Sequence, residues 1–484
     1  MGKGRWLALE SRHGQVVAHG SRECDLGNRD VWARWCWTGT VLEIRNCDLG
    51  FTPLFYRAVP NGIRVADNPL GTLEPREQAV LDYRALSVFL RLGFFVGDDT
   101  PFLGVRQLPP SAKLTWSADR GMQLSTGERA AGVQLHVGRA NAQKAYAELF
   151  RSAIRDTLPV SGPLYLPVSG GRDSRHIALA LHEAGIRPDA FVTGHRVLCA
   201  SAPGEDIRVA AMLADTLGVR HIVLRQPRCL ARAICQAIEE TGFCSDEGAW
   251  AGPLLDFQRG QGGTVYDGIA GDVMSAGLFQ TPELHASLVR GDTHGAADLV
   301  LQAWLPGTGG WEGLLDQDLQ DALSRKIAVE VIAEEMARHV DHPNPARSFY
   351  FWNRTRREIA LIPFKALSEL RVETPYLNRE LWGFLDGLPY AVVADRDFHT
   401  AVIQTAYPTY ADLPFENKDV AQPSPRFDRL LFAMDFLRHT MLRRTRRVDR
   451  LKIAKRWIGM LRNDPWWNPT MVLYLIELFA RRPH

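Results

Sequence analysis

The chain has 484 residues, of which 46% are hydrophobic and 23% are charged, and its formal net charge is +2. This composition is typical of a folded globular protein and excludes a disordered or fibrous chain, while the small net charge gives no reason to expect nucleic acid as a partner. No stretch approaches the roughly 18 uncharged apolar residues of a membrane span, and the first residues lack a signal-peptide pattern, so we expect a cytoplasmic protein.

Residues 1–137 alternate short β-rich runs with turn sequences. Runs such as "WLALE", "TVLEIR" and "KLTWS" are separated by "VPNG", "SADRG" and similar clusters. Short runs rich in β-branched and aromatic residues, with turn residues between them, are typical of antiparallel strands. We therefore predict a sheet-rich first domain over residues 1–137.

The pattern changes in the second domain, which we place at residues 138–484. Apolar runs of strand length, such as "LYLPV" and "DAFVTG", here alternate with stretches of helix length, such as "GEDIRVAAMLADTLG". This alternation predicts βαβ units and a parallel sheet, and ligand sites in such sheets lie at the carboxyl ends of the strands. The last part of the chain is predicted to be mainly helical, and the fold class is α/β.

The stretch "SGGRDS" follows the first of these strands and begins the next helix. Gly170 and Gly171 allow a tight turn and a close approach of backbone N–H groups to a ligand, and a helix N-terminus attracts anions. Ser169 and Ser174 add hydroxyl donors. Asp173 would repel a bare phosphate, so we infer Mg²⁺ between this carboxylate and phosphate oxygens.

Neither the usual phosphate loop nor the dinucleotide-binding glycine pattern is present. Instead, "SGGRDS" resembles the pyrophosphate loop of N-type ATP pyrophosphatases, and its surroundings resemble the asparagine synthetase branch, which includes β-lactam synthetases and lasso-peptide cyclases. The segment "YDGIAGDVMSAG" is similar to the family's second magnesium segment and places Asp272 at its aspartate. The resemblance implies ATP and Mg²⁺ as cofactors, Asp173 and Asp272 as metal ligands, and an adenine-nucleotide α-hydrolase-like synthetase domain.

The front domain carries the same resemblance. The segment "NCDLGFTPLFYRAVPNGIRVADNPLGTL" resembles part of the family's amidotransferase domain. Glutamine-using members have an amino-terminal cysteine as nucleophile, whereas this chain begins with Met1 and its first cysteine is Cys24. We therefore expect a degenerate, truncated Ntn-hydrolase-like domain without glutaminase activity.

The reaction that the resemblance implies is AMP- and pyrophosphate-forming amide synthesis, in which ATP activates a carboxylate that an amine then captures. Lys418, in "LPFENKDVAQPSPR", lies close to where the family carries an essential lysine, although a solvated loop lysine is the alternative interpretation. The family's base position is Ile269 here. Glu369 or Glu373 could supply the base in its place, and a structural ion pair is the alternative role of Glu373.

Other positions are candidates for nucleotide contacts. Adenine and ribose would be bound by backbone groups at the first two strand ends, while His195 either contacts ligand or is structural. The expected lining residues are Pro167, Val168, Val192 and Gly194. Gly271, in the second magnesium segment, is a further candidate.

The carboxyl-terminal part contains a basic amphipathic stretch. Arginine and lysine residues there surround Val448, Leu451, Ile458 and Leu461, which recur at helical spacing. This pattern predicts either a docking surface for a partner protein or a packed helix with a solvated basic face.

The substrates are left open by the sequence. Ring closure of a precursor peptide, as in lasso-peptide cyclases, and amide formation on a small metabolite both fit a ligase without glutaminase chemistry. A nucleotide-binding scaffold without catalysis is the alternative, and Ile269 favours it or an unusual acceptor.

Overall fold

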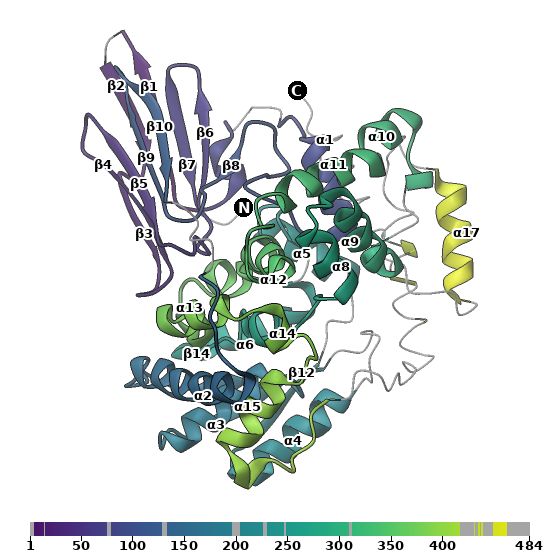
Figure 1. Cartoon of the computed structure of the whole chain (residues 1–484). Coiled ribbons are helices and arrows are strands. Elements are labelled where there is room, and N and C mark those ends of the chain that lie inside the picture. The colour runs from purple at the N-terminus through teal and green to yellow at the C-terminus, as the bar shows by residue number, and fades with distance from the viewer. Residues whose placement is uncertain are drawn as a thin grey trace.

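The structure is a computed structural model, shown in Figure 1. It describes residues 4–13, 15–74, 79–127, 133–195, 204–225, 230–245, 248–308, 312–416, 430, 434–435, 437–438 and 449–461. Lys418 and Val448 lie outside these residues.

The front part of the chain forms two five-stranded antiparallel sheets. The first has the strand order β2 (Gln15–Gly20), β1 (Trp6–Arg12), β7 (Gly62–Ala66), β6 (Phe55–Val59) and β8 (Arg106–Gln107). The second has the order β10 (Gly121–Thr126), β9 (Ala112–Ser117), β5 (Leu42–Asn46), β4 (Trp32–Trp37) and β3 (Glu23–Gly27).

The two sheets pack face to face into a sandwich, at the upper left of Figure 1. Alternate residues of the strands point between the sheets because successive strand side chains face opposite sides. Leu9 and Ile63 from one sheet and Trp35, Ile44 and Leu114 from the other therefore share one apolar core. The predicted antiparallel, sheet-rich character of this part is confirmed.

Helix α1 (Tyr83–Leu92) joins the sandwich to the rest of the chain. The side chain of Asp82 accepts the N–H of Ala85 and so caps its first turn. The helix packs against α9 (Thr293–Thr308) and α11 (Arg325–Met336). Its residues Val88 and Leu92 are fully buried in a core that also contains side chains of the later helices.

Beyond the two antiparallel sheets, the later strands form a parallel sheet, as predicted. β11 (Tyr165–Pro167), β12 (Ala190–His195) and β13 (His221–Arg225) pair in parallel, as do β14 (Thr264–Tyr266) and β15 (Arg371–Glu373). A parallel bridge between Leu164 and Thr264 joins the two groups.

The strands therefore lie in the order β13, β12, β11, β14, β15. The chain moves outward in one direction from β11 to β13 and then crosses to the other side with β14. The point between β11 and β14, where the direction reverses, is the topological switch point at which open parallel sheets bind ligands.

Helices surround this sheet and fill the space between it and the sandwich (Figure 1). Helix α2 (Arg139–Asp156) precedes the first strand of this sheet. The helices that connect or follow its strands are α3 (Asp173–Glu183), α4 (Glu205–Leu217), α5 (Leu230–Glu240), α6 (Gly248–Gln261) and α7 (Gly271–Ser275). The more distant helices include α8 (Pro282–Val289), α10 (Gln317–Ala322), α12 (Pro345–Tyr350), the π-helix η3 (Phe351–Ile359), α13 (Arg379–Gly387), α14 (Tyr390–Val393) and α15 (Phe398–Ala406).

The predicted basic helix is present as α17 (Arg450–Leu461), but its packing differs from the expectation. Among the residues of α17 whose burial is described, Ile453 is buried, at 3% exposure, whereas Leu451 is 77% and Ile458 44% exposed. The side chain of Leu461 lies outside the described part of the structure. The backbone N–H of Asp449 donates to the carbonyl of Leu314, and this anchor turns the face of Ile453 toward the protein.

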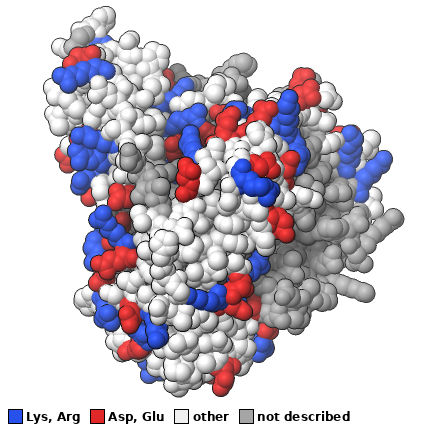
Figure 2. Space-filling model, in the orientation of Figure 1, with Lys and Arg blue, Asp and Glu red and all other residues white. Residues whose placement is uncertain are grey.

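The surface in Figure 2 has basic and acidic side chains intermixed over the face in view. Figure 2 shows no large area of a single sign among the coloured residues of this face. Among the described helices, none combines the length and the hydrophobicity required to cross a bilayer.

Candidate functional site

The "SGGRDS" segment forms the turn between β11 and α3, as predicted. The N–H of Ser169 donates to Oγ of Ser174 and the N–H of Gly171 donates to Oγ of Ser169, each over 3.1 Å from nitrogen to oxygen. The N–H of Gly170 donates to Oδ1 of Asp206, at 3.0 Å. The amides of the turn are therefore directed toward oxygen acceptors, at the point where α3 begins with Asp173.

Two other segments pack against Gly170. The N–H of Glu416 donates to the carbonyl of Gly170 over 2.9 Å. A Cβ atom added at Gly170 would lie 2.7 Å from Cβ of Glu416 and 3.1 Å from Oδ1 of Asp206. Glycine is required here because any side chain would collide with these neighbours.

Arg175, on α3, holds the segment that ends at Glu416. Its Nη1 donates to the carbonyl of Leu413 over 2.8 Å, and its guanidinium lies 3.9 Å from the ring centre of Phe415. Burial lowers the pKa of Arg175 to about 10. The turn after β11 is thus enclosed by the start of α4 on one side and by residues 413–416 on the other.

The turn after β14 lies directly against Asp173. A Cβ atom added at Gly271 would lie 2.5 Å from Oδ1 of Asp173, so only glycine permits this approach. Asp272 is the next residue, in the first turn of α7, and its Oδ1 accepts the N–H of Val273. The structure therefore brings the two magnesium segments predicted from the sequence together at the switch point.

The residues at this point fit a magnesium ion that also binds phosphate. Such ions are usually held by one or two carboxylates together with phosphate oxygens. Asp173 keeps 24% of its side chain exposed, and Asp272 is partly exposed. Within the described residues, no group of three or more His, Cys, Asp and Glu side chains that could hold a metal is found.

A buried polar cluster lies behind Asp173. Nδ1 of His399, on α15, is 3.4 Å from Oδ1 of Asp173. Nε2 of the same ring lies 3.1 Å from Nδ1 of His176, 3.2 Å from the hydroxyl of Tyr146 and 3.4 Å from that of Tyr376. Burial lowers the pKa of His399 to about 3 and that of His176 well below its usual value, so both rings are neutral.

The expected nucleotide-lining positions differ in how closely other atoms surround them. Val168 and Val192 are 3% and 1% exposed, so their side chains belong to the core and only their backbone groups remain for a ligand. A Cβ atom added at Gly194 would meet no atom within 4 Å. Pro167 ends β11. The side chain of His195 is outside the described part of the structure.

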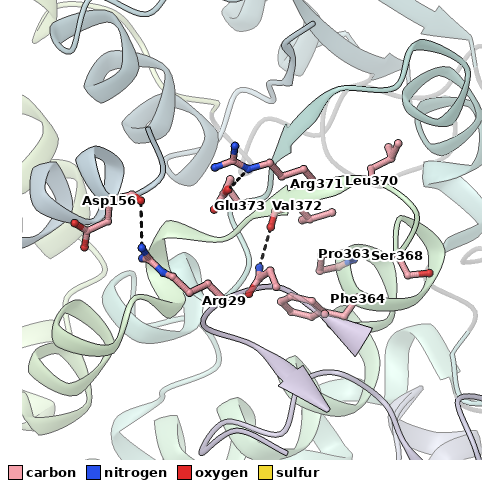
Figure 3. Close-up of a pocket in the computed structure, with 11 residues that line it drawn as sticks. Arg29, Asp156, Pro363, Phe364, Ser368, Leu370, Arg371, Val372 and Glu373 are labelled. Atoms are coloured by element: carbon pink, nitrogen blue, oxygen red, sulfur yellow. Dashed lines mark hydrogen bonds and ion pairs between the residues drawn. The ribbon is translucent and has the colours of Figure 1, made fainter. Parts of the chain in front are cut away.

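Glu373 ends β15 but its side chain does not join the two turns. Its Oε1 accepts Nε of Arg371 over 2.6 Å, which is the ion pair named as its alternative role. Both residues line a cavity of about 320 Å³ beside β15. Figure 3 shows Arg29 and Asp156 on the other side of this cavity.

The second turn contains a carboxyl group that the sequence analysis did not single out. Asp267 follows β14, and its N–H donates to the carbonyl of Glu373 over 2.9 Å. Burial raises the pKa of Asp267 to about 6, against a smaller opposing effect of the N–H of Ile269. Ile269 itself is 4% exposed and packs in the core.

The contacts of Asp206 and Glu416 with Gly170, and of His399 with Asp173, were also missed. The acidic start of the helix that contains Asp206 was the available signal for the first contact. A lone histidine in "DFHTAV" gives no such signal. Lys418 lies two residues beyond Glu416, outside the described residues.

Comparisons with known proteins add little to this geometry. No family model matches the chain, and the search of curated proteins finds no match. One similar structure, an allosteric regulatory enzyme of purine biosynthesis, has 14% identity over 41% of this chain and 48% of its own length, with a TM-score of 0.14.

A second similar structure is glutamine phosphoribosylpyrophosphate amidotransferase from B. subtilis in complex with ADP and GMP. It has 11% identity over 57% of this chain and 46% of its own length, with a TM-score of 0.14. The chain thus spans about half the length of each of these two structures.

Proposed function

We propose that the chain is an AMP-forming amide ligase that adenylates a carboxylate and transfers the acyl group to an amine. The observation that supports this most directly is the meeting of the two turns at the switch point of the parallel sheet. There Gly271 contacts Asp173, and Asp272 follows in the chain. Two carboxylate-bearing turns at the carboxyl ends of adjacent strands suit a cation with a phosphate chain.

In this proposal Asp173 and Asp272 hold Mg²⁺, and the turn after β11 binds the phosphates. When bound, Mg²⁺ would neutralise negative charge on the leaving pyrophosphate. The N–H of Gly170 already donates to Asp206, so a phosphate oxygen competes with that carboxylate for the N–H. The start of α3 adds the positive end of its dipole.

The overall reaction balances in two steps. A substrate carboxylate oxygen attacks the α-phosphorus of ATP, and the bond to the bridging oxygen breaks to release pyrophosphate. The amine then attacks the acyl carbon, AMP leaves, and the amine loses one proton to a base. Each preorganised donor that meets the developing charge lowers the barrier by about 3 kcal/mol.

Lys418 is proposed as a cation for the first step. Glu416 contacts Gly170, and two further residues of chain span at most about 7 Å. Glu373 is proposed as the base for the second step. Its ion pair with Arg371 must open before it can accept a proton.

Two classes of substrate are proposed. An intramolecular peptide amide, as a lasso-peptide cyclase forms, and an amide of a small metabolite both need this chemistry. A non-catalytic nucleotide-binding scaffold is the competing function, and one observation favours it. Ile269 is buried at the position of the family's base, so this position supplies no proton acceptor.

Calorimetry of ATP binding tests the site. We expect Mg²⁺-dependent binding in the wild type and its loss in Asp173→Ala and Asp272→Ala. Asp298→Ala is the matched control, because it removes an exposed carboxylate from α9 that pairs with Arg325. Unchanged affinity in the two site variants would remove the metal assignment.

Pyrophosphate–ATP exchange tests the reaction class. Adenylation is reversible, so a suitable carboxylate should drive incorporation of labelled pyrophosphate into ATP, with pools of amino acids and peptides as the probe. Mg²⁺-dependent binding without exchange for any carboxylate would favour the scaffold. Release of ADP with phosphate would overturn the reaction class.

A further inference from the structure

The buried cluster behind Asp173 connects both turns of the site. Oγ of Ser275 donates to the carbonyl of Gly271 over 2.7 Å. Because its hydrogen is used there, the hydroxyl of Tyr146 is the donor in its 3.0 Å contact with Oγ of Ser275. The hydroxyl of Tyr376 donates to the carbonyl of Asp173 over 3.2 Å.

The contact with Asp173 indicates the tautomer of His399. Oδ1 of this carboxylate can only accept a hydrogen, so the hydrogen of the neutral ring belongs on Nδ1, and Nε2 then accepts from a neighbour such as Nδ1–H of His176, at 3.1 Å. A neutral imidazole that accepts at Nε2 carries its hydrogen on Nδ1. That nitrogen is 3.4 Å from Oδ1 of Asp173, a distance that a small carboxylate rotation closes to a hydrogen bond.

The two oxygens of Asp173 have different environments. Oδ1 is buried, although the side chain as a whole is 24% exposed. The exposure of the side chain therefore comes from atoms other than Oδ1, which faces His399. A buried neutral donor behind one oxygen of a metal-binding carboxylate orients the other, as partners of metal ligands generally do.

We propose that His399 is a positioning residue that holds Oδ1 of Asp173 through Nδ1–H and thereby presents the second oxygen of this carboxylate to the cation. This role rests on the proposed function, because it assumes that Asp173 is a metal ligand. Tyr146, His176, Tyr376 and Ser275 fix the ring and link it to the turn that precedes Asp272.

The test compares His399→Asn with His399→Gln. An asparagine amide N–H is attached at the same number of bonds from Cβ as Nδ1, whereas a glutamine amide reaches toward the position of Nε2. Mn²⁺ affinity is measured in the presence of ATP from the paramagnetic resonance signal of the free ion. We expect His399→Gln to weaken Mn²⁺ binding about tenfold or more, and His399→Asn to stay within about threefold of the wild type.

His339→Gln is the matched control. His339 is 2% exposed and, like His399, contacts a hydroxyl and a carboxylate, with Nδ1 at 2.8 Å from Oγ of Ser348 and Nε2 at 3.3 Å from Oε1 of Glu335. We expect this variant to lower the unfolding temperature but to bind Mn²⁺ as the wild type does. Tyr376→Phe is a milder second variant, which removes only the hydroxyl on the Asp173 carbonyl and should weaken binding about threefold.

The outcomes separate the two proposals. If the wild type does not bind Mn²⁺ with ATP, or if Asp173→Ala binds it equally well, the proposed function fails and the role of His399 fails with it. If Asp173→Ala abolishes binding but His399→Asn and His399→Gln retain equal affinity, only the positioning role is wrong. If His399→Gln binds Mn²⁺ about tenfold more weakly than His399→Asn and the two variants unfold at similar temperatures, the positioning role is supported.

Discussion

Asp267 is a carboxyl group that folding makes harder to ionise. It lies in the turn after β14, and burial raises its pKa from the usual 3.8 to about 6. Because the folded-state pKa is above the unfolded one, the folded protein binds the proton more tightly. The stability that the protonated carboxyl group contributes is fully present below about pH 4 and is lost as the pH rises through about 6.

Asp267→Asn should therefore stabilise the protein in a pH-dependent way. Asparagine keeps an oxygen acceptor for the N–H of Ile269, which donates to Oδ1 of Asp267 over 2.8 Å, but never carries charge. We expect the variant to match the wild type near pH 4 and to exceed its free energy of unfolding by about 2–3 kcal/mol above pH 7. Thermal unfolding from pH 4 to 8 measures this, and an offset independent of pH would contradict it.

At the scale of single residues, the sequence predicted what is local in the chain. "SGGRDS" is six consecutive residues, and its turn and hydroxyls depend on neighbours within five positions. The residues that complete the site are distant in sequence. Gly170 and Asp206 are 36 residues apart, and Tyr146 and His399 are 253 apart. Such contacts depend on how helices pack, which a local pattern does not determine.

At the scale of elements, the π-helix η3 joins the helical part to the sandwich through two buried arginines. Arg356 is fully buried and donates from Nε to the carbonyl of Gly50 over 3.1 Å and from Nη2 to that of Leu108 over 2.8 Å. Arg357 donates from Nε to Oε1 of Gln107 over 2.7 Å. The donors of Arg356 satisfy buried backbone carbonyls, and Nε of Arg357 satisfies the side-chain amide oxygen of Gln107.

Removal of one of these arginines should be costly. In Arg356→Met the side chain stays large and apolar, but the carbonyls lose their donor and the partly exposed Asp98 loses its ion pair. We expect the free energy of unfolding to fall by about 3 kcal/mol. Denaturant unfolding measures the change.

Arg12→Met is the comparison variant, because Arg12 is 65% exposed and pairs with Glu10, which is 42% exposed. An exposed pair contributes less than about 1 kcal/mol. Equal losses in Arg12→Met and Arg356→Met would show that the buried arginine does not join the two parts.

At this scale, prediction from the sequence missed elements that are short or have an unusual period. Strand β15 has three residues, too few to show the alternation that identifies a strand. The π-helical turns of η3 have a period that a search for amphipathic helices does not detect.

At the scale of the whole molecule, the sandwich and the parallel sheet are connected by shared cores. Phe51, from the sandwich part, and Phe351, from η3, have ring centres 5.1 Å apart and are both fully buried. One core contains Val88 and Phe94 together with residues of α2, α3 and α11. A boundary after residue 137, as the change of pattern predicted, separates two kinds of sheet but does not separate these cores.

We therefore expect the chain to unfold in one transition. Unfolding of the helices around the parallel sheet would expose the apolar residues that α1 and Phe51 bury against them, so the sandwich would lose part of its own support. The test places one cavity in each part. Ile44 is buried in the core between the two antiparallel sheets, and Leu213, on α4, is buried beside the parallel sheet.

Ile44→Ala and Leu213→Ala should each reduce the free energy of unfolding by about 2–5 kcal/mol. In a cooperative molecule both variants lower the temperature of the same single calorimetric peak. Val289→Ala is the control, because Val289 is 62% exposed, and it should leave the peak in place. Two peaks, of which Ile44→Ala moves one and Leu213→Ala moves the other, would show that the parts unfold independently and that the shared cores do not couple them.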